Sequence, residues 1–173
     1  MSEVRERERY LEHNNDPSDD GYRNFLARIM GPLRERVAKG AKGLDFGCGP
    51  VTVLAEMLED SGFEMEVYDP IFHERPEALK GEYDFVVSTE VLEHLSKPHS
   101  ELDRLFSLLG HGGVLALMTR PLEEDVDFKT WHYKNDPTHI CFYSEPVFEW
   151  ISAEFNIGFT REGHDIFVFE KSK

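Results

Sequence analysis

Apolar side chains recur along this chain with two spacings, one typical of amphipathic helices and the other of buried strands. From Phe25 to Val37 an apolar residue stands at every fourth position, which predicts a helix over residues 21–39. Gly31-Pro32 lies inside this span and should break or kink the helix. Short apolar or alternating runs predict strands at residues 43–47, 63–68, 83–88, 114–119, 157–160 and 165–170.

Segments with helical spacing separate most of these strands, at residues 51–58, 102–109 and 148–155. Such alternation predicts an α/β fold, a Rossmann-like and mostly parallel sheet flanked by helices. The last two strands follow each other directly, so we expect them to close the sheet as an antiparallel pair. We assign the domain to residues 41–173 and an N-terminal arm and helix to residues 1–40.

The first 20 residues are polar, with alternating arginine and glutamate, and this composition favours a mobile arm. Tyr10, Leu11 and Tyr22 nevertheless give the segment apolar surface with which to dock. The arm could therefore fold over a pocket as a lid, and the sequence leaves both possibilities open.

Length and charge limit the possible partners. The 173 residues suffice for one α/β domain, and the two cysteines suggest no disulfide framework. Residues 1–40 hold eight acids and eight bases, whereas residues 41–173 hold 26 acids and 11 bases, so the net charge of −15 lies entirely in the second part. Nucleic-acid binding usually requires a basic surface and is therefore not expected. No signal peptide or membrane span is visible, and we expect a cytoplasmic protein.

The segment Leu44–Pro50 (LDFGCGP) lies between a predicted strand and a predicted helix. Glycines at 47 and 49 permit a sharp turn and close approach of a ligand. Thr52 stands where the dinucleotide fingerprint G-x-G-x-x-G requires its third glycine, which disfavours a nicotinamide oxidoreductase. Asp45 suits a cofactor with a cationic amine, and Asp69, 20 residues after Gly49, stands where ribose hydroxyls would lie.

Four segments together resemble the class I S-adenosylmethionine-dependent methyltransferases, in the order in which that family has them. They are the glycine-rich Gly43–Pro50, Tyr68-Asp69, Tyr83–Leu95 (YDFVVSTEVLEHL) and Gly112–Thr119 (GGVLALMT). The resemblance implies S-adenosyl-L-methionine as cofactor, bound by Asp45, Phe46, Gly47, Cys48, Gly49, Asp69, Pro70 and Glu90. The flanking segments Tyr22–Leu33 and Asp136–His139 resemble a subgroup of small bacterial methyltransferases that carries no known acceptor.

This chain departs from the family pattern after the second strand. The strand that begins at Tyr83 starts only 14 positions after Asp69, which leaves too few residues for a helix–strand–helix unit. The family's third strand should therefore be abbreviated or absent, and with it the residue that contacts adenine. Backbone or Phe72 contacts could replace it.

Two histidines are the candidate catalytic residues. Thr130–Tyr143 (TWHYKNDPTHICFY) lies where this fold commonly covers the acceptor, and His139 within it could accept a proton or could only anchor the loop. His94 follows Glu90 by four residues, which places both on one face of a predicted helix; both could equally be structural. The spacing of His132, His139 and Cys141 matches no familiar zinc pattern, so we expect no metal.

The sequence thus predicts a methyltransferase whose acceptor is a small molecule, with an oxygen or nitrogen as the attacking atom. Two alternatives remain. The chain could be a non-catalytic subunit that binds S-adenosylmethionine, or it could methylate a protein.

Overall fold

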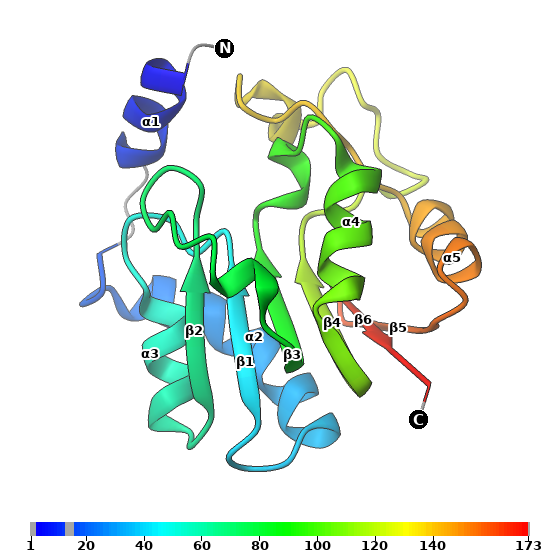
Figure 1. The fold of residues 1–173 in the computed structure, drawn as a ribbon. Helices are drawn as coiled ribbons and strands as arrows, with labels where there is room; N and C mark the ends of the chain where they lie inside the picture. The colour runs from blue at the N-terminus through cyan, green and yellow to red at the C-terminus, as the bar shows by residue number, and fades with distance from the viewer. Residues whose placement is uncertain (1–2, 13–15, 173) are drawn as a thin grey trace.

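The computed structural model describes residues 3–12 and 16–172, which form a six-stranded sheet with helices on both faces (Figure 1). The strands are β1 (Lys42–Phe46), β2 (Glu64–Tyr68), β3 (Tyr83–Thr89), β4 (Leu109–Met118), β5 (Gly158–Glu162) and β6 (Ile166–Glu170). The α-helices are α1 (Glu3–Glu12), α2 (Asp20–Arg36), α3 (Val53–Asp60), α4 (Pro98–Ser107) and α5 (Glu145–Glu154). Short 3₁₀ helices are η1 (Ala78–Lys80), η2 (Leu92–His94) and η3 (His132–Asn135).

The strand order is β2-β1-β3-β4-β6-β5. The first four strands in this order are parallel, whereas β6 runs antiparallel to β4 and pairs with β5 as an antiparallel hairpin. The mostly parallel sheet and the antiparallel C-terminal pair are therefore confirmed. Between β2 and β3 the chain forms only an isolated bridge between Asp69 and His73 and the single turn η1, so no strand follows β2 at that edge.

Alternate residues of the central strands face opposite helical layers, as expected for a sheet buried on both sides. Phe85 and Val87 of β3 pack in a core with α2 and α3, while Val86 between them packs in a second core with α4 and α5. The sheet is thus fixed on both faces, and the loops that follow its carboxyl ends are free to form a site.

Part of the N-terminal segment is helical. Residues 3–12 form α1, which stands at the carboxyl-end edge of the sheet (Figure 1). The expectation that Gly31-Pro32 breaks the next helix is wrong, because α2 continues through Pro32 to Arg36. Proline removes one backbone hydrogen bond, but the buried side chains of Ile29 and Leu33 hold this stretch against the sheet.

Within the part of the chain that the structure describes, no helix combines the length and apolar character needed to cross a bilayer.

Candidate active site

A cavity of about 620 Å³ opens beside the carboxyl ends of β1, β2 and β3. Its wall includes the loop after β1, the turn after β2, the segment after β3, the start of α4, and residues from α1 and α2. Of the ten predicted site residues, nine line it: Phe46, Gly47, Cys48, Gly49, Asp69, Pro70, Glu90, His94 and His139. Residues far apart in sequence therefore share one cavity at the edge where open α/β sheets bind ligands.

The loop after β1 needs glycine for two reasons. Gly47 has a φ of 79°, a conformation that side-chain-bearing residues rarely adopt, and a Cβ there would overlap the side chain of Val91. The amide of Gly47 donates to the carbonyl of Tyr68 at 2.7 Å, which ties the loop to the end of β2. The backbone of Gly47–Pro50 is consequently held against the cavity with no side chain at Gly47 or Gly49 to obstruct a ligand.

Asp69 organises two loops with one carboxylate. Its Oδ2 accepts the amide of Gly49 at 3.0 Å, and its Oδ1 accepts the amides of Ile71 at 2.8 Å and Phe72 at 2.9 Å. A carboxylate offers about four acceptor positions, so this one retains capacity for a ligand hydroxyl on the side that faces the cavity.

Asp45 is the one predicted cofactor residue that does not line the cavity. Its side chain is 3% exposed and lies behind the glycine loop. Burial, together with the negative charge of Asp69, raises the pKa of Asp45 to about 7, while a hydrogen bond from the backbone of Ala55 acts in the opposite direction. Because Ala55 belongs to the first turn of α3, Asp45 contacts the start of that helix from the interior.

Glu90 stands at the end of β3 in a strained conformation. Its φ is 53°, in the left-handed region, and its amide donates to the carbonyl of Met118 at 2.7 Å. The prediction that Glu90 and His94 share a helical face is wrong, because only Leu92–His94 is helical there, as the single 3₁₀ turn η2. Burial and the adjacent Glu93 raise the pKa of the Glu90 carboxyl well above its usual range.

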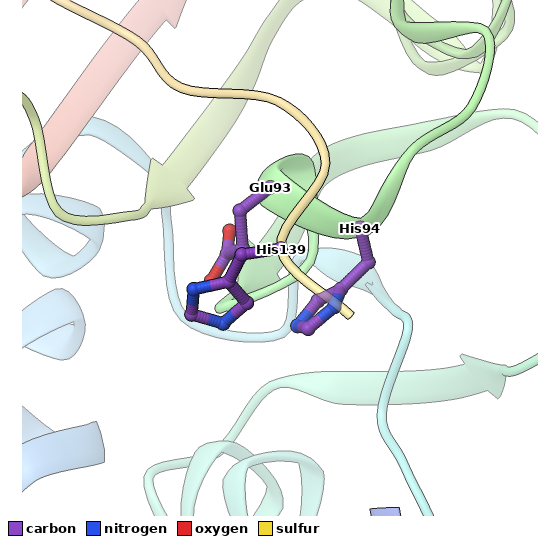
Figure 2. Close-up of side chains that lie close together, drawn as sticks. All are labelled: Glu93, His94 and His139. Carbon is purple, nitrogen blue, oxygen red and sulfur yellow. The ribbon is translucent and has the colours of Figure 1, made fainter. Parts of the chain in front are cut away.

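His94 and His139 meet at the opposite wall, with ring centroids 4.8 Å apart (Figure 2). Nδ1 of His94 lies 3.1 Å from the carbonyl of Thr138, and Nδ1 of His139 lies 2.7 Å from the carbonyl of Tyr133. A carbonyl oxygen can only accept, so each Nδ1 carries a proton, and the neutral form of each ring has its lone pair on Nε2. Burial lowers the pKa of His94, which favours this neutral form.

Glu93 is not among the predicted site residues, yet it is fully buried behind these histidines. Its carboxylate accepts hydrogen bonds from the hydroxyls of Thr119, at 2.9 Å, and Tyr133, and its backbone carbonyl accepts two amides from residues 140–141. The hydroxyl oxygen of Tyr133 also lies 3.2 Å from a carboxyl oxygen of Glu90. Glu93 thus joins the segment after β3, the end of β4 and the loop that carries His139.

Glu93, His94 and His139 could together hold a metal ion, since their ligand atoms lie within 4.8 Å of one another (Figure 2). The three residues considered as metal ligands from the sequence, His132, His139 and Cys141, do not come together among the residues that the structure describes. His132 faces Arg120 at the surface, and the thiol of Cys141 donates to the carbonyl of Leu95 at 3.1 Å.

Helix α1 reaches both sides of the cavity. On the side of the β2 turn, the guanidinium of Arg7 lies 5.3 Å from the ring centroid of Phe72. On the histidine side, Tyr10 packs edge-on against His94 and Arg9 pairs with Asp136 at 2.8 Å. The helix therefore bridges the β2 turn and the loop that carries His139.

Known proteins resemble this chain in sequence and in fold. A family model described as a methyltransferase domain matches residues 19–159. Ubiquinone biosynthesis O-methyltransferases from Erwinia tasmaniensis and Sodalis glossinidius are 32% and 35% identical over 91 and 92 residues. These matches cover 53% and 51% of this chain but only 37% of each relative, so the chain matches little more than a third of their length.

Solved structures extend the likeness over nearly the whole chain. Magnesium protoporphyrin IX methyltransferase from Synechocystis, with bound S-adenosylhomocysteine, has a TM-score of 0.62 at 15% identity and covers 99% of this chain and 95% of its own. 1,6-Didemethyltoxoflavin-N1-methyltransferase from Burkholderia thailandensis has a TM-score of 0.66 at 15% identity. The match covers 98% of this chain and 88% of that enzyme. At this identity the likeness establishes the fold. With the family match, it shows that the chain belongs to the class I S-adenosylmethionine-dependent methyltransferases.

Proposed function

We propose that this chain transfers the methyl group of S-adenosylmethionine to an oxygen or nitrogen of a small molecule. The observation that carries the proposal is the shared cavity, which joins the glycine loop and Asp69 to His94 and His139. One wall therefore supplies groups suited to a cofactor, and the other supplies groups suited to an acceptor.

On the cofactor wall, Asp69 would accept the ribose hydroxyls with the capacity that its three backbone partners leave. The turn at Ile71 and Phe72 would border the adenine, in place of the missing strand. Gly47–Pro50 would contact the methionine portion through its backbone. Asp45, behind this loop, would act by holding it rather than by touching the cofactor.

When bound, the cofactor supplies an electrophilic methyl group on a sulfonium. An acceptor atom held in line would form a bond to the methyl carbon as the carbon–sulfur bond breaks, and the sulfur would keep that electron pair. If the acceptor is a hydroxyl, its proton passes to the Nε2 lone pair of His139 or His94. The protein otherwise contributes by holding both reactants in line.

Helix α1 favours a small acceptor over a protein. Its contacts to Phe72, His94 and Asp136 cross the cavity, whereas a protein substrate would need an open approach. The names of the relatives include both an O-methyltransferase and an N-methyltransferase, in agreement with either attacking atom.

The test is transfer of radiolabelled methyl from S-adenosylmethionine to fractionated small-molecule extract and, separately, to protein extract. The proposal predicts label in the small-molecule fraction. Label confined to protein would establish the protein methyltransferase instead. Cofactor binding with no transfer to either fraction would favour the non-catalytic subunit.

A further inference from the structure

A second cavity, of about 470 Å³, lies beside the first on the other side of Glu90. Phe25 and Glu90 belong to the walls of both cavities. The second wall is completed by Arg28 from the middle of α2, the segment after β4, η3 and the turn between β5 and β6. A molecule in this cavity would therefore lie next to the site proposed for the cofactor.

Most of the charged side chains around the second cavity are already paired. Asp165 forms an ion pair with Arg28 at 2.9 Å, and Glu123 pairs with Arg161, which also pairs with Glu145. Burial and the adjacent Glu93 raise the pKa of Glu90. Arg120 is the other charged residue of this wall.

Arg120 has no acidic partner among the residues that the structure describes. Its Nη1 lies 3.0 Å from Nε2 of His132, which must accept this hydrogen bond as a neutral imidazole. Guanidinium groups form paired hydrogen bonds with carboxylates and phosphates, and Arg120 retains the donors to do so. It follows Thr119 directly, beyond the carboxyl end of β4, where this class of fold places ligands.

The remaining wall suits a small ring. Phe25, Pro121 and Tyr133 supply apolar and aromatic surface, and the volume is that of a small-molecule site. We infer that the acceptor extends from the histidine wall past Glu90 into the second cavity, as an aromatic or similarly flat molecule whose carboxylate or phosphate group pairs with Arg120. This inference rests on the proposed function, since it identifies the chemical class of the acceptor.

The test uses three probes of the same ring size: benzoate, phenyl phosphate and the neutral benzamide. Each is titrated calorimetrically into protein saturated with S-adenosylhomocysteine, so that the cofactor site is occupied. At least one anion should bind at least ~10-fold more tightly than benzamide. Which anion prevails distinguishes a carboxylate acceptor from a phosphate acceptor.

Arg120→Gln should reduce the binding of the preferred anion to the level of benzamide while leaving the affinity for S-adenosylhomocysteine unchanged. Arg34→Gln removes an exposed arginine that lines neither cavity, and it should leave the preference intact. If neither anion binds better than benzamide, or if the preference survives Arg120→Gln, the inference is overturned. Failure of the wild-type protein to bind S-adenosylhomocysteine would instead overturn the proposed function.

Discussion

Asp69 accepts the backbone amide of Gly49 at 3.0 Å, so the acid at the end of β2 fixes the glycine loop that follows β1. The two residues are 20 positions apart in the chain, and both line the large cavity. The loop and the carboxylate therefore form one unit, and a change to either is expected to affect cofactor binding through the other.

Replacing Asp69 should separate these effects. Asp69→Ala removes both the ribose acceptor and the three backbone contacts, and we expect binding of S-adenosylhomocysteine to weaken at least ~10-fold by calorimetry, about 1.4 kcal/mol. Asp69→Asn keeps one carbonyl oxygen and should lose less. The thermal unfolding of both variants, measured without ligand, reports the loss of the backbone contacts separately from the loss of the ribose acceptor. Wild-type affinity in Asp69→Ala would show that the ribose lies elsewhere.

Helix α1 should act as a lid over the cofactor. Since its contacts span both walls of the cavity, S-adenosylhomocysteine is expected to slow amide hydrogen exchange in residues 3–12. Arg9→Gln removes the pair with Asp136 and should reduce that protection by at least ~3-fold. Arg5→Gln changes an exposed arginine of the same helix and serves as the control. Equal exchange with and without ligand would leave α1 a passive segment.

The sheet was predictable from sequence because its strands are buried on both faces and so appear as short apolar runs. The six predicted strands correspond to β1–β6, and the short connection after Asp69 correctly indicated the missing strand. The predicted break at Pro32 was wrong because burial of the helix face on either side outweighs the local cost of the proline.

Glu93 could not be identified from sequence. It stands between Leu92 and His94 with nothing to distinguish it from a solvent-exposed acid. Its role depends on Thr119 and Tyr133, which only the folded chain brings to it. The second cavity could not be predicted from sequence for the same reason, because its wall combines residues as distant as Phe25 and Asp165.

His139 is expected to act in turnover rather than in cofactor binding. Its Nδ1 is engaged by the carbonyl of Tyr133, so His139→Ala should change the affinity for S-adenosylhomocysteine by less than about threefold. With a hydroxyl acceptor, turnover should fall roughly a hundredfold. Full activity would remove His139 from the mechanism and leave His94 as the candidate, with His94→Ala as the next variant.

The pH profile of turnover should depend on which imidazole accepts the proton. Burial lowers the pKa of His94 from its reference value of 6.5, and only the neutral ring can accept a proton. If His94 is the base, activity should therefore be retained as pH falls to about 6.5 and be lost only below it. An acid limb with its midpoint clearly above pH 7 would contradict this assignment.

Asp45 should make stability depend on pH. Its pKa is raised to about 7 in the folded chain against 3.8 as a reference, so the folded state binds the proton more tightly than the unfolded state. Its contribution is therefore complete below about pH 4 and is lost as pH rises to 7, at no more than about 1.4 kcal/mol per unit. Asp45→Asn should lack this slope, so the difference in unfolding free energy between the wild type and the variant should change between about pH 4 and 7. Parallel curves from pH 4 to 8 would contradict it.

The central claim is that the large cavity binds S-adenosylmethionine with its methyl group directed toward the histidine wall. A crystal structure of the chain with S-adenosylhomocysteine tests it most directly. We predict that the ribose hydroxyls lie within hydrogen-bonding distance of Asp69, and that the sulfur faces the space bounded by Glu90, His94 and His139. A ligand bound outside this cavity, or one whose sulfur faces away from that space, would contradict the account.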